Sequence, residues 1–286
     1  MRSEIAAGLT LVLILLLGWG GYALLFGEGG GARLSVESVE GEVRRQVDGR
    51  SELAQPGQAL EERDRIVAGL DGTAVLALDD GSSRVVVRPK SEVTVKSVGA
   101  DGLRVGLEGG RVEARVLEGG RPVTVEAGER AVRTADGDVA VARGADGTVV
   151  VRATRGGADL FGFGTAVRAS AGQDVVAPAG GRAVQVADHA GDLLLDVSWP
   201  GEAQTRAVMA EVRGTTQPGA QLTVSCGAGA VHAAADPDGR FTVQVALAEG
   251  VNTCTVHALG LLGEEVDQQH VIERDTTGPS IKATFP

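Results

Sequence analysis

Aromatic side chains are scarce in this chain, which has five Phe, two Trp and one Tyr among 286 residues. None lies between positions 27 and 160, and the later ones are Phe161, Phe163, Trp199, Phe241 and Phe285. Binding surfaces for sugars and for single-stranded nucleic acid depend on stacking against such rings. The sequence therefore argues against a carbohydrate-binding or a single-strand-binding surface.

Clusters of basic residues are also missing, and the formal net charge is −11. A chain with this charge is repelled at long range by nucleic acids and by anionic lipid headgroups. Its Arg residues are mostly spaced singly along strand-like stretches, often with Asp or Glu close by, as on a solvated sheet face. We therefore expect no nucleic-acid partner and no docking on lipid headgroups by charge.

Motifs of catalysis and of metal binding are absent as well. The chain has no His-Glu-x-x-His, Walker or Gly-x-Ser-x-Gly sequence. Its Asp-Gly pairs lack the spacing of a calcium loop. The densest acidic cluster, Glu61, Glu62 and Asp64, is interspersed with arginines, and we interpret it as a solvated turn. We expect no catalytic residue, no metal site and no cofactor, so the chain is not predicted to be an enzyme.

One long apolar segment lies near the start of the chain, where 22 residues from Ile5 to Phe26 carry no charge. A helix of this length spans roughly 33 Å, enough to cross a hydrocarbon core of about 30 Å. Trp19, Tyr22 and Phe26 gather at its far end, where aromatic side chains favour the membrane interface. We therefore predict a transmembrane helix over 5–26, with these three residues as interface anchors.

The flanking residues predict the orientation of this helix. Residues 1–4 include Arg2, which together with the α-amino group favours a cytoplasmic N-terminus, so we expect the body on the far side. The glycine-rich stretch 27–35 is expected to be a flexible linker. A cleaved signal peptide is the alternative, because Gly21-Tyr22-Ala23 resembles a small-x-small cleavage site. The apolar run, however, continues beyond that site to Phe26.

The rest of the chain is predicted to be all-β. Short segments rich in Val and Thr, such as Thr73–Leu78, Arg84–Val87 and Gly147–Val151, are separated by turn signals about every 8–12 residues. Many of these signals are Asp-Gly pairs, which begin at Asp48, Asp71, Asp80, Asp101, Asp136 and Asp146. Such pairs supply the positive φ that tight hairpins require, so we expect each of them to form a turn.

One part of this β-rich region has a recognisable order of turn and strand residues. It runs through Gly41-Glu42-Val43, Gly57, Leu60, Asp64-Arg65-Ile66, Gly72–Ser82, Pro89–Val93 and Gly109–Val112. This order resembles the FecR domain family over about residues 36–179, and we assign the domain to 36–180. The resemblance implies a β-roll or β-helix-like module that works by protein contact, with no catalytic centre as a family trait.

The resemblance also implies a place in the bacterial envelope. In the best-studied members of the FecR family, a cytoplasmic N-terminal segment controls a sigma factor and the periplasmic part senses an outer-membrane receptor. Here only residues 1–4 precede the predicted membrane helix, and even a small domain needs around 40 residues. We therefore expect a single-pass protein of the bacterial inner membrane with a periplasmic body, and no direct control of a sigma factor by this polypeptide.

A second pattern follows an expected linker over 181–191. Apolar and polar residues alternate over most of four runs, Thr205–Gly214, Pro218–Val224, Asp238–Val245 and Glu249–Val256. Half-buried strands of a two-sheet sandwich have this alternation. The order of the runs, ending in Arg274–Pro279, resembles bacterial immunoglobulin-like adhesive and spacer domains. The resemblance implies an immunoglobulin-like β-sandwich over 192–286 and says little about a ligand.

Cys226 and Cys254 are the only cysteines, and each lies in or at the end of a predicted strand of this second domain. In an oxidising compartment such a pair is most simply a disulfide within the sandwich. A disulfide that closes the loop between Cys226 and Cys254 stabilises the fold by on the order of 3–4 kcal/mol. The alternatives are a redox couple, which requires Cys-x-x-Cys spacing, and a metal site that uses His232, His257 or His270.

Together these observations predict a protein-binding scaffold of the cell envelope. Phe161 and Phe163 alternate with glycines and are candidate aromatic contacts for a partner, with core packing as their alternative role. Other contacts are expected from aliphatic side chains, arginine pairs and strand addition at an open sheet edge. The competing hypothesis is signalling, in which the membrane helix couples periplasmic binding to a separate membrane or cytoplasmic regulator.

Overall fold

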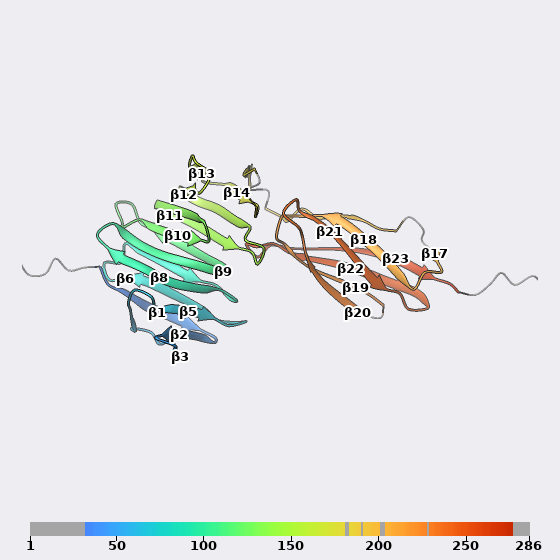
Figure 1. Ribbon diagram of the computed structural model, residues 1–286, viewed down its shortest axis with the longest axis horizontal. Helices are drawn as coiled ribbons and strands as arrows, with labels where there is room; N and C mark the ends of the chain where they lie inside the picture. The colour runs from blue at the N-terminus through green and yellow to red at the C-terminus, as the bar shows by residue number, and fades with distance from the viewer. Residues whose placement is uncertain (1–31, 181–182, 190, 201–203, 228, 277–286) are drawn as a thin grey trace, which may run out of the picture.

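A computed structural model describes residues 32–276, except 181–182, 190, 201–203 and 228. All regular elements in these residues are β-strands, and they form two bodies that follow one another along the long axis of the molecule (Figure 1). The predicted membrane helix and its anchors Trp19, Tyr22 and Phe26 lie outside the described residues. The residues that the structure describes include no helix that could span a membrane.

The first body is built from 15 strands that belong to one sheet. Its first eight strands are β1 (Leu34–Glu40), β2 (Val43–Val47), β3 (Arg50–Leu53), β4 (Ala59–Leu60), β5 (Arg65–Ala68), β6 (Thr73–Leu78), β7 (Ser83–Val87) and β8 (Glu92–Gly99). The others are β9 (Gly102–Val116), β10 (Val123–Ala127), β11 (Arg130–Arg143), β12 (Val149–Phe161), β13 (Val167–Ser170), β14 (Gln173–Ala177) and β15 (Gln185–Asp188). The last strand, β15, pairs with β14 and lies inside the segment predicted as a linker.

The long strand β9 organises this sheet. Its N-terminal half pairs with β8 and, in parallel, with β10, whereas its C-terminal half pairs with β7 and β11. Gly109 and Gly110 separate the two halves, and Gly110 has a φ of +88°. A Cβ at Gly110 would lie 2.6 Å from the carbonyl oxygen of Lys90, so only glycine fits this close approach of two strands. The sheet bends here, and its two halves face each other.

One hydrophobic core lies between the two halves of the bent sheet. It consists of Val, Leu, Ile and Ala side chains, and its largest fully buried members include Leu34, Ile66, Leu76, Leu103, Leu107 and Leu160. These side chains alternate with more exposed ones along most strands, because successive residues of a strand point to opposite faces. Aliphatic side chains, many of them Val, therefore fill the buried core of this body, in which aromatic residues are scarce.

Four of these Asp-Gly pairs lie between consecutive strands, namely those that begin at Asp48, Asp71, Asp80 and Asp146, and a fifth, Asp101-Gly102, leads from the turn after β8 directly into β9. The sixth, Asp136-Gly137, lies within β11, where the register with β12 shifts. Gly137 has a φ of +113°, and a Cβ there would lie 3.0 Å from the Cα of Gly156 on β12. The pair forms a bulge that bends two neighbouring strands together. The prediction of a turn at Asp136 is therefore wrong.

The acidic cluster at 61–64 is also more than a solvated turn. Asp64 is 2% exposed, and its carboxylate accepts hydrogen bonds from Arg45 Nε (2.9 Å) and Nη2 (2.6 Å). It also accepts one from the backbone N–H of Glu61 (2.9 Å). Glu61 and Glu62 are exposed, as expected. A buried carboxylate persists only when it is paired and hydrogen-bonded, so Asp64 has a structural role that its neighbours in the sequence lack.

The second body contains two sheets around a common core. Its strands are β16 (Asp196–Ser198), β17 (Gln204–Thr205), β18 (Met209–Thr215), β19 (Gln221–Cys226), β20 (Gly229–Ala234), β21 (Arg240–Ala246), β22 (Gly250–Leu259) and β23 (Glu265–Arg274). One sheet has the order β16-β18-β21 and the other β17-β23-β22-β19-β20. Alternate residues from both sheets, such as Val212, Leu222, Val243 and Val256, fill the core between them. The alternating sequence pattern is thus explained by two sheets that each bury one face.

Candidate functional site

The two bodies meet at the tip of the β22–β23 hairpin, residues 260–264, which we call the hairpin tip. Leu262 of the hairpin tip packs against Ala142 and Val150 on the outer face of the first sheet, and Leu261 lies against the same cluster. Ala142 and Val150 are direct cross-strand neighbours on β11 and β12. They form a small apolar patch on a face that otherwise carries many charges, and the patch explains where the second body docks.

Two arginines of the first sheet hold the hairpin tip by polar contacts. Arg111 of β9 donates a hydrogen bond to the carbonyl oxygen of Leu262, and Arg152 of β12 forms an ion pair with Glu264. Arg152 also donates two hydrogen bonds of 2.7 Å each to the carboxylate of Asp174 on β14. The side chains of this Asp174–Arg152–Glu264 triad are only 13–15% exposed. Solvent screens these pairs less than it screens surface ion pairs, so they hold the two bodies in one orientation.

The surroundings shift the pKa values of the two arginines in opposite directions. Burial is the largest effect on Arg111 and lowers its pKa. Burial also disfavours the charged form of Arg152, but the hydrogen bonds and the charges of Asp174 and Glu264 outweigh it and raise the pKa. The Nε of Arg111 has no hydrogen-bond partner among the described residues. Arg111 is therefore the less well compensated charge at the junction.

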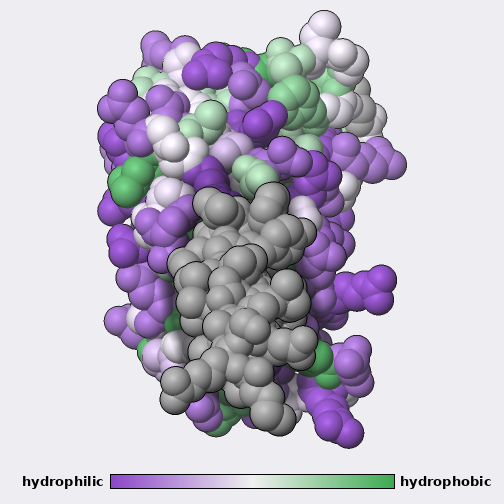
Figure 2. Space-filling view, turned by 90° about the vertical axis from the view of Figure 1, so that its left-hand side faces the viewer, coloured by the Kyte–Doolittle hydropathy of each residue, from purple (hydrophilic) through white to green (hydrophobic). Residues whose placement is uncertain are grey.

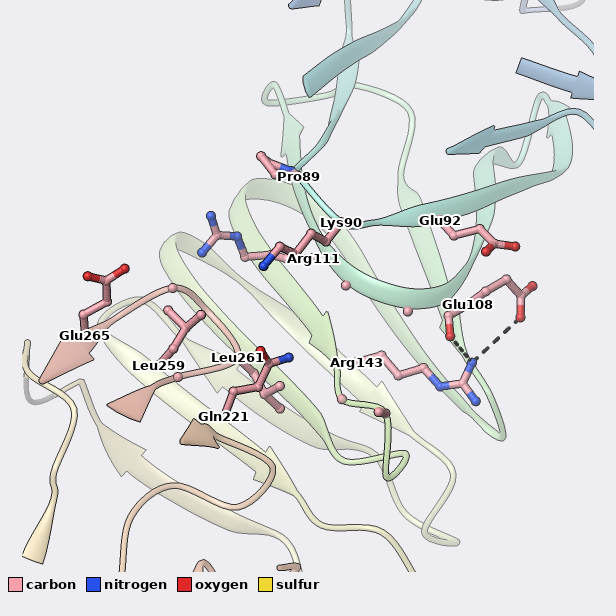
Figure 3. A pocket seen from close by; sticks show the side chains of 16 residues that line it. Pro89, Lys90, Glu92, Glu108, Arg111, Arg143, Gln221, Leu259, Leu261 and Glu265 are labelled. Atoms are coloured by element: carbon pink, nitrogen blue, oxygen red, sulfur yellow. Dashed lines mark hydrogen bonds and ion pairs between the residues drawn. The ribbon is translucent and has the colours of Figure 1, made fainter. Parts of the chain in front are cut away.

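A groove of about 650 Å³ lies at this junction (Figure 3). Its charged lining consists of Lys90, Arg111, Arg143, Glu92, Glu108 and Glu265, three cations and three anions. Arg143 donates a hydrogen bond to the backbone carbonyl of Glu108 (2.9 Å) and lies 3.8 Å from the carboxylate of the same residue. Leu259 and Leu261 add apolar surface. Because its charges balance, we call it the neutral groove.

A second groove of about 530 Å³ has a different lining. The first body contributes residues of β12, β14 and β15, and the second body contributes 192–196, 215–218 and Glu264. Five carboxylates line it against one guanidinium, and these residues are Asp174, Asp188, Asp192, Asp196, Glu264 and Arg152. His189 also lies here, with its Nδ1 3.2 Å from Asp174 Oδ2. We call it the acidic groove.

The two candidate aromatic contacts differ in their surroundings. Phe163 packs against the first core, and the Arg130 guanidinium lies 5.0 Å from its ring centroid. Arg130 in turn donates hydrogen bonds to the carbonyl oxygens of Ala177 and Pro178. Phe161, at the end of β12, is 42% exposed. The structure thus places Phe163 in the packing of the body and leaves Phe161 accessible, and neither residue lines the two grooves.

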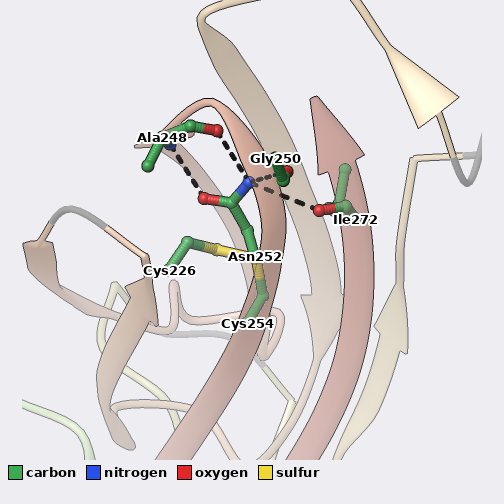
Figure 4. Close-up of a disulfide and its surroundings, with 6 residues drawn as sticks. All are labelled: Cys226, Ala248, Gly250, Asn252, Cys254 and Ile272. Atoms are coloured by element: carbon green, nitrogen blue, oxygen red, sulfur yellow. Dashed lines mark hydrogen bonds between the residues drawn. A yellow bond between two sulfur atoms is a disulfide. The ribbon is translucent and has the colours of Figure 1, made fainter. Parts of the chain in front are cut away.

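Cys226 and Cys254 form a disulfide (Figure 4). They are directly opposite each other on β19 and β22, with a Cα–Cα distance of 4.2 Å, so the bond joins two strands of one sheet. Beside it, the buried Asn252 accepts a hydrogen bond from the N–H of Ala248 (2.8 Å) and donates to the carbonyls of Ala248 and Gly250 (2.9 Å each). These hydrogen bonds fix the loop before β22, and this is the structural role of the Asn in the Glu-Gly-x-Asn sequence.

Polar and charged side chains dominate the end of the first body that Figure 2 shows outside its grey atoms, with apolar residues scattered among them. On the outer face of the sheet, the Asp138 carboxylate accepts hydrogen bonds from Arg115 (2.7 Å) and Arg155 (3.1 Å) on the neighbouring strands. Arg88 and Glu113 form a bidentate pair at 2.7 and 2.6 Å. The singly spaced arginines are thus paired across strands, which gives the first sheet little net charge of its own.

Sequence patterns did not predict the junction. Its clearest local signal is the pair Leu261-Leu262 between Gly260 and Gly263, because a turn that joins two alternating strands normally carries polar residues. Arg111 and Arg152 have no such signal, since their sequence context matches that of the other singly spaced arginines. A site that two bodies share depends on which faces meet, and local patterns do not contain that information.

Comparison with known proteins assigns no family to the chain. No family model matches it, and none of the curated proteins matches its sequence significantly. Seven chains of known structure match, among them two crystal structures of a "putative anti-sigma factor" from Parabacteroides distasonis ATCC 8503. Each has a TM-score of 0.39 and 16% identity, and the match covers 43% of this chain and 59% of that protein. A similarity of this extent supports no inference about function.

Proposed function

We propose that this chain is a membrane-anchored, periplasmic protein-binding scaffold of the bacterial cell envelope that performs no catalysis. In this proposal residues 5–26 anchor it in the inner membrane, and the two β bodies present binding surfaces to another envelope protein. The first body then corresponds to the FecR-like module and the second to the immunoglobulin-like sandwich that the sequence suggests. The disulfide between Cys226 and Cys254 supports the choice of an oxidising compartment.

The observation that carries the proposal is the junction itself. The hairpin tip and the Asp174–Arg152–Glu264 triad fix the two bodies in one orientation, with grooves of about 650 and 530 Å³ beside the contact. Grooves between domains and open sheet edges are common places for a partner to bind. A pre-organised groove also binds with less loss of conformational entropy than a flexible one. Recognition of a protein partner is the function that this geometry supports best.

Site-specific photocrosslinking in intact cells tests the proposal. A photoreactive amino acid replaces Leu194, which is 77% exposed in the acidic groove, or Ala145 in the neutral groove. Val251 is the matched control, because it is 70% exposed and lies at the other end of β22 from the junction. We expect a periplasmic or outer-membrane protein to crosslink from the groove positions and not from Val251.

Other outcomes of the crosslinking decide between the remaining hypotheses. Crosslinks to a membrane-embedded or cytoplasmic regulator alone would favour the signalling hypothesis over the scaffold. Equal crosslinking from Val251 and Leu194, or none from either groove, would contradict a binding site at the junction. The membrane anchor is tested separately by mass spectrometry of the protein from membranes, because a chain that begins near Leu24 has lost the segment as a signal peptide.

A further inference from the structure

We propose that the open edge of β15 and the acidic groove beside it bind an extended, positively charged segment of the partner protein by strand addition. This inference deepens the proposed function and rests on it, because it specifies how the partner is recognised. Three observations carry it: the direction of the backbone groups of β15, the side chains that the groove presents, and the charge of those side chains.

The free edge of β15 follows from its pairing. β15 ends the order of strands in the first sheet and pairs on one side only, with β14. The N–H of His189, directly after β15, donates to the carbonyl oxygen of the residue just before β14 (2.7 Å). In an antiparallel pair, every second residue of a strand directs both its N–H and its C=O group to the same neighbouring strand. The backbone groups of Gln185 and Ala187 therefore point to β14, like the N–H of His189. Val186 and Asp188 therefore direct their N–H and C=O groups to the open edge.

Side chains of the same strand line the acidic groove. Ala187 is the cross-strand neighbour of Asp174, which in turn is the neighbour of Arg152 on β12, so all three side chains lie in one row on one face. A strand added beside β15 extends this row, and every second side chain of the added strand then points into the groove. Leu194 of the second body offers an apolar contact at the same place.

The charge of the groove determines which kind of segment fits. Two of its carboxylates are paired with Arg152. The other three, on Asp188, Asp192 and Asp196, have no ion-pair partner in the described part of the chain. One buried oxygen of Glu264 also lacks a hydrogen-bond partner there. A concave surface with uncompensated charge of one sign attracts groups of the opposite sign, so Lys or Arg side chains complement it.

A metal ion is the other cation that carboxylates attract. Among the residues that the structure describes, no group of three or more His, Cys, Asp or Glu is arranged to hold one. The outward backbone groups of Val186 and Asp188 instead match the repeating N–H and C=O groups of another polypeptide. The combination of an open edge and an acidic groove therefore selects a basic peptide segment in extended conformation.

Fluorescence anisotropy with the purified full chain in a nonionic detergent tests this inference. The probe is a fluorescein-labelled peptide, Lys-Val-Lys-Leu-Lys-Val-Lys, and a Glu-for-Lys version serves as its charge control. We expect saturable binding of the Lys peptide only. The triple substitution Asp188→Asn, Asp192→Asn and Asp196→Asn should weaken it about tenfold or more, because it removes the uncompensated charge.

A matched triple variant separates the groove from the overall charge. Glu62→Gln, Asp101→Asn and Glu118→Gln remove the same number of charges at exposed positions that do not line the groove. We expect this variant to bind the Lys peptide like the unmodified chain. If the two triple variants lose binding equally, the attraction is to the acidic chain as a whole and the proposed site is wrong.

A proline substitution tests strand addition directly. Val186→Pro removes an N–H that β14 does not use, and proline is tolerated at such edge positions. We expect it to weaken peptide binding about tenfold or more while the thermal midpoint stays unchanged. Only one set of alternate residues in an added strand directs its N–H groups to β15. Of two peptides that are N-methylated on alternate sets of residues, one should therefore bind more weakly than the unmodified probe and the other should bind like it. If Val186→Pro and both methylated peptides leave binding unchanged, strand addition is wrong.

The failure of this inference can be distinguished from the failure of the proposed function. If the purified chain does not bind the Lys peptide while Leu194 still crosslinks to a periplasmic protein in cells, only the mode of recognition is wrong. If the peptide binds as expected while no envelope protein crosslinks from either groove, the site exists and the scaffold role is wrong.

Discussion

At the scale of single residues, the buried Asp64 shows how one carboxylate stabilises several segments. It joins β2, through Arg45, to the turn before β5, through the N–H of Glu61. Asp64→Asn removes the charge and leaves the largely buried Arg45 with the exposed Glu52 (3.2 Å) as its ion-pair partner. We therefore expect the free energy of unfolding to fall by about 2–4 kcal/mol. Chemical unfolding measures this change. Glu62→Gln, at an exposed position two residues away, is the control, and equal effects of the two substitutions would contradict the role of Asp64.

Asp138 makes a pH-dependent contribution to the stability of the fold. Burial alone raises its pKa, but the hydrogen bonds from Arg155 and Arg115 outweigh it, and the pKa lies below its usual value. A carboxyl group with a lowered pKa stabilises the fold above its unfolded-state pKa, and this stabilisation is lost as the pH falls through the folded-state pKa. The stability difference between the unmodified chain and Asp138→Asn should therefore shrink below about pH 4. Unfolding midpoints at pH 7, 4 and 3 check this, and a difference that stays constant across them contradicts it.

At the scale of elements, the bend of β9 can be tested with two adjacent glycines. Gly110 has a positive φ and no room for a Cβ, so Gly110→Ala should destabilise the first body by about 2 kcal/mol or more. A methyl group on Gly109 would meet no other atom within 4 Å, so Gly109→Ala should change stability by about 1 kcal/mol or less. Thermal and chemical unfolding measure both variants. Similar effects of the two substitutions would show that Gly110 is not the residue that permits the bend.

Most elements could be predicted from the sequence because they depend on local chemistry. The segment Thr73–Leu78 is predicted as a strand and is β6. Of the six Asp-Gly pairs predicted above to form turns, five lie at the turns that join consecutive strands. Asp136-Gly137 was not predictable as a bulge, because its role depends on Gly156 in the next strand. The same reason applies to Asp64, whose partner Arg45 lies on another strand. Predictions from the sequence therefore fail where a residue that is distant in the sequence determines which of two local structures forms.

At the scale of the whole molecule, the candidate site has no counterpart in any single stretch of sequence. The acidic groove combines Asp174 of β14, Asp192 before β16 and Glu264 of the hairpin tip. Each of these residues resembles the many other acidic residues of a chain with a net charge of −11. The composition of the chain suggests that these acidic residues lie on solvent-exposed faces. Only the docking of the two bodies brings their charges together in one concave surface.

The docking of the two bodies can be tested at the hairpin tip. Leu262→Ser removes the apolar contact with Ala142 and Val150, so we expect faster amide hydrogen exchange across residues 260–264. The cores of both bodies should keep their protection, because neither depends on this contact. Val251→Ser is the control, because Val251 is exposed and lies at the end of β22 that is distant from the hairpin tip. Unchanged exchange at the hairpin tip in Leu262→Ser would mean that the polar contacts alone hold the junction.

The order of synthesis gives the apolar patch on β11 and β12 a further consequence. Leu261 and Leu262 are made more than a hundred residues after Val150. The last strand of the first body ends at Asp188. At a synthesis rate of about 5–20 residues per second, the complete first body therefore precedes the hairpin tip that covers its patch by roughly 4–15 s. During this interval Ala142 and Val150 face solvent or other chains. The chain is therefore most prone to mispairing with its neighbours at a stage when its first half is folded and its second half is not yet made.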